Sequence, residues 1–135
     1  MIRQLDDRTM VSGQVAPHEV AALAEQGVTM LVNNRPDGEE PDQPRAAELE
    51  EAAAQAGIAY RFVPIMRGIG PADVEAMQEA FGQAGDGKML AFCRSGTRSI
   101  VTWSLAQATS GAKSRGDLVS LGRQAGYDLS GVLGG

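Results

Sequence analysis

The sequence predicts an α/β fold in three layers, a mostly parallel sheet with helices on both faces. Short apolar runs have the length and composition of strands, and segments with helical periodicity separate them. Glycine or proline stands at most of the junctions between the two kinds of segment. Strands that alternate with helices form parallel sheets, because each helix carries the chain back across one face of the sheet.

Each helix is expected where apolar residues recur every three or four positions, and most of the helices end near a glycine. Proline opens the first three, which suits the first turn of a helix. The fourth is apolar almost all round, so it is expected to be buried at the centre of the fold. The expected helices are 17–26, 44–56, 71–82, 100–106 and a last one from Ser114 to Gly126.

Each strand is expected where a short apolar run is bounded by turn residues. The run 28–33 is apolar nearly throughout, as in a strand covered on both faces. The last run leads directly into Cys93, and the glycine-rich tail, 130–135, is expected to fray. The expected strands are 2–5, 10–12, 28–33, 59–63 and 88–92.

Length and composition limit the functions that the chain can have. A chain of 135 residues predicts a single domain over 1–135. The net charge of −5 and the lack of a basic tract argue against nucleic acid or a membrane surface as partners. No apolar run approaches the ~20 residues that span a bilayer, and no signal peptide is visible, so a cytoplasmic location is expected. The single cysteine excludes an intrachain disulfide, and no metal or cofactor is predicted.

The seven residues 93–99, Cys-Arg-Ser-Gly-Thr-Arg-Ser, carry the chemistry, and we call them the cysteine loop. They join a buried strand to a buried helix. Gly96 permits a tight turn in which successive backbone N–H groups can face one anion. The following helix adds unpaired N–H groups and the positive end of its dipole. The loop is therefore expected to bind an anion.

A lone buried cysteine is more often an inert apolar residue. Here the glycine three positions later and the arginine five positions later favour a reactive Cys93, whose thiolate the positive potential would stabilise. Arg98 is expected to bind an oxyanion with two N–H groups, as the second catalytic residue. Ser99 is expected to donate to the thiolate or to the loop backbone. The residues predicted to bind the anion or substrate are Arg94, Ser95, Gly96, Thr97, Ser99, Arg67 and Arg35.

The cysteine loop resembles the active loops of dual-specificity-type cysteine phosphatases and of rhodanese sulfurtransferases. Across nearly its full length, the chain resembles the phosphatase-like domain family of beta-lactamase-hydrolase-like proteins. The resemblance rests on Val-Ser-Gly-Gln at 11–14, Asn-Asn-Arg-Pro-Asp-Gly-Glu at 33–39 and the cysteine loop. It implies a cysteine-phosphatase-like fold, with some members described as sulfurtransferases and some fused to persulfide- or sulfide-oxidising modules. It also favours Arg35 bracing the loop through Asp37 or Glu39, against an ordinary solvated charge.

A phosphatase of this type needs a general acid and an arginine six residues after the cysteine. Ser99 occupies that position here, and Phe92 stands where these phosphatases carry histidine. Asp73 is the nearest candidate for the acid, although its place in the first turn of a helix suits a purely structural role.

Sulfur transfer does not need a general acid, because the leaving sulfite or thiolate is already a stable anion. Cys93 would attack the outer sulfur of thiosulfate or a persulfide, form a persulfide and pass the sulfur to a thiol acceptor. Arg67, Arg94 and Arg98 would attract the anionic donor. We therefore predict a sulfurtransferase, with sulfide detoxification as a setting and a persulfide- or sulfide-oxidising enzyme as a partner. The alternative is a phosphatase that forms a phosphoenzyme on Cys93, and the third is an inactive module that binds an anion or a partner.

Overall fold

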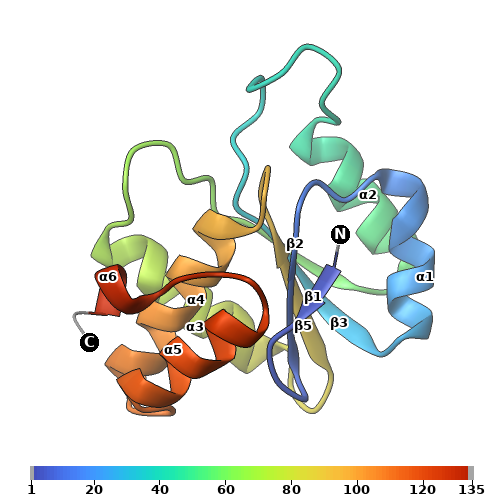
Figure 1. Cartoon of the computed structure of the whole chain (residues 1–135). Helices are drawn as coiled ribbons and strands as arrows, with labels where there is room; N and C mark the ends of the chain where they lie inside the picture. Colours follow the sequence, from blue (N-terminus) through green and yellow to red (C-terminus); the bar gives the residue numbers. More distant parts are fainter. Residues whose placement is uncertain (1, 134–135) are drawn as a thin grey trace.

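The structure is a computed structural model that describes residues 2–133. Its centre is one five-stranded sheet in the order β1-β2-β5-β3-β4 (Figure 1). The first two strands are antiparallel and the remaining pairs are parallel. The mostly parallel sheet is therefore confirmed, including the two short strands near the N-terminus. The strands are β1 (Ile2–Gln4), β2 (Thr9–Ser12), β3 (Val28–Asn33), β4 (Ala59–Phe62) and β5 (Lys88–Phe92).

Helices cover both faces of this sheet, so the predicted three layers are confirmed (Figure 1). On one face lie a 3-10 turn and two helices: η1 (Pro17–Glu19), α1 (Val20–Glu25) and α2 (Ala46–Ala56). On the other face lie α3 (Pro71–Gln83), α4 (Thr97–Ser110), α5 (Arg115–Gln124) and α6 (Ser130–Leu133).

Alternation along the strands divides the core into two halves. Leu31 and Leu90 point toward α1 and α2, whereas Met30 and Met89 point toward α3 and α4. Successive side chains of a strand point to opposite faces, so a continuously apolar strand can serve both halves. Trp103, in the middle of α4, is fully buried, as the apolar pattern of that helix predicts.

Most element boundaries lie within one or two residues of the sequence-based prediction, and the larger or more informative differences are in α4, α2 and the tail. α4 begins at Thr97, so the last residues of the cysteine loop are already helical. α2 begins at Ala46 instead of 44, where the Asp37 carboxylate accepts the Ala46 N–H at 2.7 Å. The tail does not fray throughout, because Leu133 is buried in the core and its segment forms α6. Residues 134–135 lie outside the described part of the chain.

The sheet order decides where the cysteine lies. β5 sits between β2 and β3 and is parallel to both, so the carboxyl ends of three parallel strands meet around Cys93. This edge is the usual place for a ligand in an α/β sheet. Within residues 2–133, no helix has the length and apolarity needed to cross a membrane.

Candidate active site

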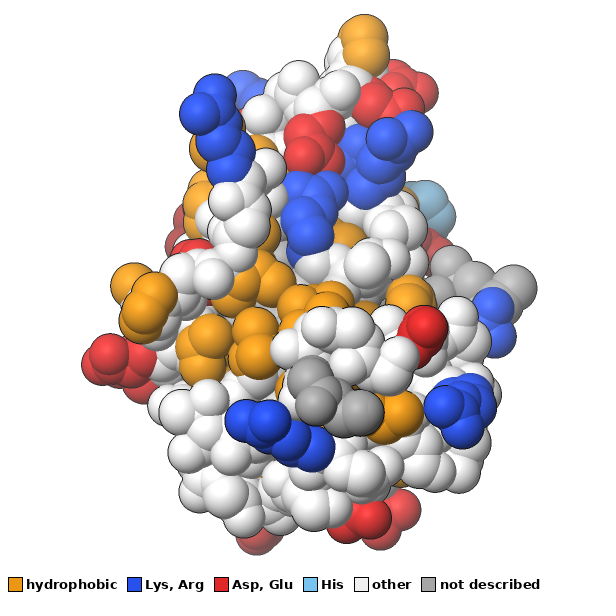
Figure 2. Space-filling view, turned by 60° about the vertical axis from the view of Figure 1, so that its left-hand side comes forward, with side chains coloured by type: hydrophobic (Ala, Val, Ile, Leu, Met, Phe, Trp, Pro, Cys, Tyr) orange, Lys and Arg blue, Asp and Glu red, His pale blue; other side chains and the backbone are white. Residues whose placement is uncertain are grey.

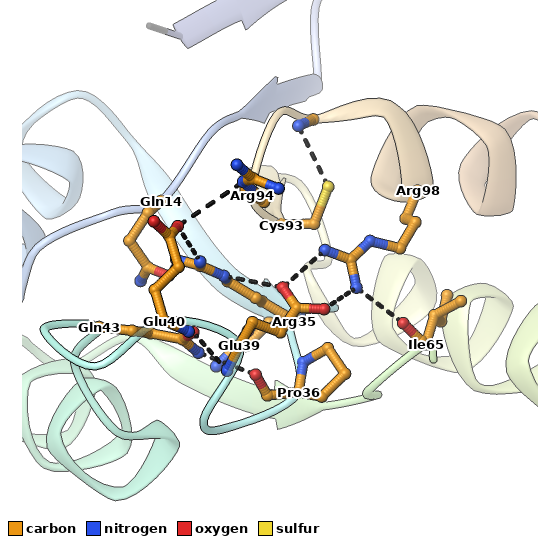
Figure 3. Close-up of polar contacts among 12 residues, drawn as sticks. Gln14, Arg35, Pro36, Glu39, Glu40, Gln43, Ile65, Cys93, Arg94 and Arg98 are labelled. Carbon is orange, nitrogen blue, oxygen red and sulfur yellow. Dashed lines mark hydrogen bonds and ion pairs between the residues drawn. The ribbon is translucent and has the colours of Figure 1, made fainter. Parts of the chain in front are cut away.

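Cys93 lies at the bottom of the cysteine loop, directly after β5. Its side chain is buried, and its Sγ accepts the Gly96 N–H at 3.1 Å (Figure 3). The sulfur is therefore shielded from solvent, but it accepts a hydrogen bond from the backbone. We expected several backbone N–H groups to converge here; within residues 2–133, the Gly96 amide is the one hydrogen-bonded to Sγ.

Gly96 also begins α4 as its N-cap residue, with a left-handed φ of 89°. A side chain is strained at such a φ, which explains why glycine stands here. The cap makes no side-chain hydrogen bond to the helix. The first N–H groups of α4 are therefore available to an anion, together with the positive end of the helix dipole.

The segment after β2 supports the loop from one side. The Ser12 carbonyl accepts the Cys93 N–H at 3.2 Å. A Cβ on Gly13 would lie 3.0 Å from the Arg94 carbonyl oxygen, closer than an ordinary van der Waals contact, so glycine favours this close approach of the two backbones. The Val-Ser-Gly-Gln motif therefore contacts the cysteine loop directly.

Arg98 projects from the first turn of α4 toward a carboxylate. Its Nη1 and Nη2 donate to Glu39 at 2.8 and 2.9 Å, and Nη1 also donates to the Ile65 carbonyl at 2.8 Å (Figure 3). These contacts use one edge of the guanidinium. The Nε–H takes no part in them, so the Nε/Nη2 edge can still bind an oxyanion. The Glu39 hydrogen bond and the nearby Cys93 charge both raise the pKa of Arg98 above its ordinary value, so it stays a cation.

Arg35 braces this arrangement instead of meeting the substrate. Its side chain is 4% exposed and donates to Glu39 at 2.9 Å, to Glu40 at 2.6 Å and to Gln14 at 2.9 Å. The predicted pairing with Glu39 is confirmed, whereas Asp37 caps α2 instead. Because Glu39 binds both arginines, it joins the loop after β3 to the cysteine loop (Figure 3).

Contrary to our expectation, the Ser99 hydroxyl contacts neither the thiolate nor the loop backbone, and its role in binding an anion through its backbone N–H stays a prediction. Its hydroxyl is fully buried behind the loop and donates to the Asn34 Oδ1 at 2.8 Å. Asn34 in turn donates through Nδ2 to the Val63 carbonyl at 3.0 Å, so it ties together the ends of β3, β4 and α4. Sequence reasoning gave Asn34 no role of its own, although it lies in the 33–39 motif.

The entrance to the loop is rich in charge. The Arg94 side chain is 68% exposed, with its Nε 3.6 Å from Glu40. Arg67 is exposed in the segment that follows Ile65. The Ser95 and Thr97 hydroxyls are hydrogen-bonded to each other at 3.1 Å. Figure 2 shows arginine or lysine and acidic side chains close together at the upper end of one face, with hydrophobic side chains beneath them.

Asp73 occupies a structural position. Its Oδ2 accepts the Gly70 N–H at 2.9 Å, at the first turn of α3. An acidic side chain here satisfies a free amide and interacts favourably with the helix dipole. The structure therefore gives Asp73 the capping role that the sequence offered as the simpler interpretation, and within residues 2–133 its carboxylate makes no hydrogen bond or ion pair to the cysteine loop.

The sequence gives no indication that Tyr127 contacts the cysteine loop. Tyr127 follows α5, and its hydroxyl donates to the Ser95 carbonyl at 3.0 Å, from 32 positions further along the chain. A Cβ on Gly96 would lie 2.4 Å from this hydroxyl oxygen. No local motif marks the residue, because the contact depends on how α5 packs.

Residues 1–110 match the family described as the phosphatase-like domain of beta-lactamase hydrolase-like protein. The chain belongs to this family. A beta-lactamase hydrolase-like protein of Xylella fastidiosa is 37% identical over 129 residues, which cover 95% of this chain and 30% of that protein. The chain thus spans about a third of the length of the curated relatives that it matches.

Solved structures agree on the fold of this family member. A candidate phosphatase from Neisseria meningitidis superposes with a TM-score of 0.81 at 30% identity, covering 98% of this chain and 94% of that one. Tk-PTP in its active form gives a TM-score of 0.72 at 20% identity, covering 98% and 90%. The cysteine-phosphatase-like fold is confirmed. The comparisons support the phosphatase alternative better than the sulfurtransferase prediction, since none of these relatives is described as a sulfurtransferase.

Proposed function

We propose that this chain is a Cys93-dependent sulfurtransferase on a phosphatase-like fold. The observation that carries the proposal is that Glu39 and Asp73 are both engaged in other contacts, so neither is placed to give a proton to a leaving group. Glu39 is bound to Arg98 and Arg35, and the Arg98 hydrogen bond holds the pKa of Glu39 below its ordinary value of 4.5. It therefore carries no proton near neutral pH, and Asp73 is engaged as a helix cap. A reaction whose leaving group needs no proton suits this site best.

The transfer then proceeds in two steps. The Cys93 thiolate attacks the outer sulfur of thiosulfate, so that the new S–S bond forms while the bond to the sulfonate sulfur breaks and sulfite leaves with the electron pair. Cys93 now carries a persulfide. An acceptor thiolate attacks its outer sulfur, takes it as a new persulfide and restores the Cys93 thiolate. A persulfide donor would react in the same way, releasing a thiolate in place of sulfite.

The charges around the loop suit such a donor. The free Nε/Nη2 edge of Arg98 and the first amides of α4 would bind the sulfonate oxygens. Arg94 and Arg67, both exposed, would raise the local concentration of the anion. A thiol acceptor and a persulfide- or sulfide-oxidising enzyme acting beside it belong to the same proposal.

The test is intact-mass spectrometry after incubation with thiosulfate. We expect Cys93 to gain one sulfur atom, sulfite to be released in equal amount, and glutathione to remove the added sulfur. Cys93→Ser is the matched control, in which both signals vanish. If the reduced protein gains no sulfur at any thiosulfate concentration, the proposal is contradicted.

The comparisons favour phosphate-ester hydrolysis as the second candidate. Cys93 would attack phosphorus to form a phosphoenzyme while the ester oxygen leaves, and water would then release phosphate. Aryl phosphates with good leaving groups test it directly, because they need little help from an acid. Efficient Cys93-dependent turnover without any sulfur uptake would establish this candidate. Failure of both reactions in a folded protein would leave an inactive anion- or partner-binding module.

A further inference from the structure

One peptide unit of the cysteine loop is held at both ends. The Gly96 N–H donates to Cys93 Sγ at 3.1 Å, and the Ser95 carbonyl accepts the Tyr127 hydroxyl at 3.0 Å. This carbonyl and this N–H belong to the same trans peptide, so they point in opposite directions. Fixing the oxygen toward Tyr127 therefore fixes the N–H toward the sulfur.

This peptide is one that could otherwise rotate. Gly96 has φ 89° and ψ −13°, close to the third residue of a type II turn. Type I and type II turns differ by rotation of the peptide that precedes this residue, and glycine accepts the φ of either type. The rotated peptide would point the Ser95 carbonyl, with its partial negative charge, at Cys93. Such a loop would disfavour both the thiolate and a bound anion.

Tyr127 is itself held firmly in place. Its N–H donates to the Gly122 carbonyl at 2.8 Å, and Gly126 before it turns the chain with φ 95°. Leu129, 1% exposed, packs so closely on Gly122 that a Cβ there would lie 2.7 Å from it. The packing of α5 thus delivers the hydroxyl to the loop from outside residues 1–110, the part of the chain that matches the family.

The hydroxyl also keeps its proton. Burial raises the pKa of Tyr127 above its ordinary value, and the negative charge of Cys93 raises it further. The Tyr127 hydroxyl therefore remains a hydrogen-bond donor near neutral pH. Donation to the Ser95 oxygen polarises the peptide and makes its N–H a stronger donor to the sulfur.

We propose that Tyr127 is a positioning residue, whose hydroxyl locks the 95–96 peptide with its N–H toward Cys93 and so stabilises the reactive thiolate. The inference rests on Cys93 acting as the nucleophile. It holds both for sulfur transfer, where Cys93 forms a persulfide, and for phosphate-ester hydrolysis, where Cys93 forms a phosphoenzyme. Within residues 2–133, the charged or titratable groups that face Cys93 are Arg98 on α4, backed by Glu39, and Tyr127 itself.

The experiment compares Tyr127→Phe with the unaltered protein. The variant keeps the ring and loses the hydroxyl. The rate of Cys93 alkylation by iodoacetamide is followed against pH, and hydrogen exchange of the Gly96 amide is followed by NMR. Tyr60→Phe is the matched control, since it also removes a partly buried hydroxyl that is hydrogen-bonded, to Asn33 and Ala46, but away from the cysteine loop.

We expect the midpoint of alkylation to move upward by about half to one pH unit in Tyr127→Phe, with faster exchange at Gly96 and an unchanged profile in Tyr60→Phe. A profile and an exchange rate identical to those of the unaltered protein would overturn the inference. If Cys93 of the unaltered protein is unreactive at neutral pH, the proposed function fails. The Gly96 exchange rate still decides the inference in that case, because it reports the peptide lock without any reaction.

Discussion

Arg98 and Glu39 lie on segments 59 residues apart and form a two-point ion pair, with N–O distances of 2.8 and 2.9 Å. The pair has a clear geometric consequence. Glu39 holds the Nη1/Nη2 edge of the guanidinium, and the adjacent Nε/Nη2 edge is left for an oxyanion beside Cys93. An arginine held in this way loses little side-chain entropy when an oxyanion arrives, which favours tight and well-oriented binding.

The Arg98–Glu39 pair should make stability depend on pH. The pKa of Glu39 is lowered in the folded protein, mainly by the Arg98 hydrogen bond, from an ordinary value of 4.5. The pair therefore stabilises the fold fully above about pH 4.5, and its contribution disappears as the pH falls through the lower, folded-state pKa. Glu39→Gln should be less stable by about 1 kcal/mol or less at pH 7. Urea unfolding from pH 7 to pH 3.5 should show the two proteins converging; a constant difference would contradict this account.

Arg98→Lys should separate charge from geometry. A lysine ammonium keeps the positive charge but cannot hold Glu39 at two points and bind an oxyanion with a second edge. We expect kcat/KM to fall by about 100-fold, close to the loss of an oxyanion-binding group in other enzymes. Arg94→Lys is the comparison, because Arg94 is exposed and acts through charge alone. Equal effects of the two substitutions would argue against a bidentate role for Arg98.

Ser99→Ala should weaken the fold more than the chemistry. The substitution leaves the buried Asn34 Oδ1 without the Ser99 donor, which typically costs about 1–3 kcal/mol. Denaturant unfolding measures this, with Ser110→Ala as the matched control because that hydroxyl bonds a helix carbonyl near the surface. The reactivity of Cys93 should change little. A large loss of reactivity with full stability would instead favour the contact between Ser99 and the thiolate that the sequence suggested.

Asp73→Asn tests the phosphatase alternative. An asparagine can still accept the Gly70 N–H, so the start of α3 should remain intact. If Asp73 is a cap, turnover of phosphate esters with poor leaving groups should change by less than about threefold, whereas removal of a general acid typically costs about 100-fold or more. Turnover of alkyl and aryl phosphates, compared in the two proteins, distinguishes these outcomes.

Patterns local to the sequence predicted most of the fold. Apolar runs such as β3 and proline or glycine at the ends of helices identify the elements, and their alternation predicts the parallel sheet. The start of α4 was missed because the polar residues Thr97 to Ser99 conceal the apolar periodicity of the helix. The packing of Leu133 likewise depends on neighbours distant in sequence, so α6 could not be predicted from a glycine-rich tail.

The site was predictable to the extent that its residues are contiguous. The cysteine loop and the brace at Arg35 could be recognised, because each lies in a compact motif. The partner of Ser99 and the contact of Tyr127 could not, since both join segments that only the folded sheet and helices bring together. The sequence also could not show whether Asp73 reaches the cysteine loop. In the structure its carboxylate accepts a hydrogen bond from Gly70 at the start of its own helix.

The enclosure of Cys93 has a consequence for selectivity. A sulfur with no contact with bulk solvent is shielded from disulfide exchange with passing proteins and from diffusing oxidants. A donor has to enter the cysteine loop before its reacting atom can meet the sulfur, so binding in the loop precedes any reaction at Cys93.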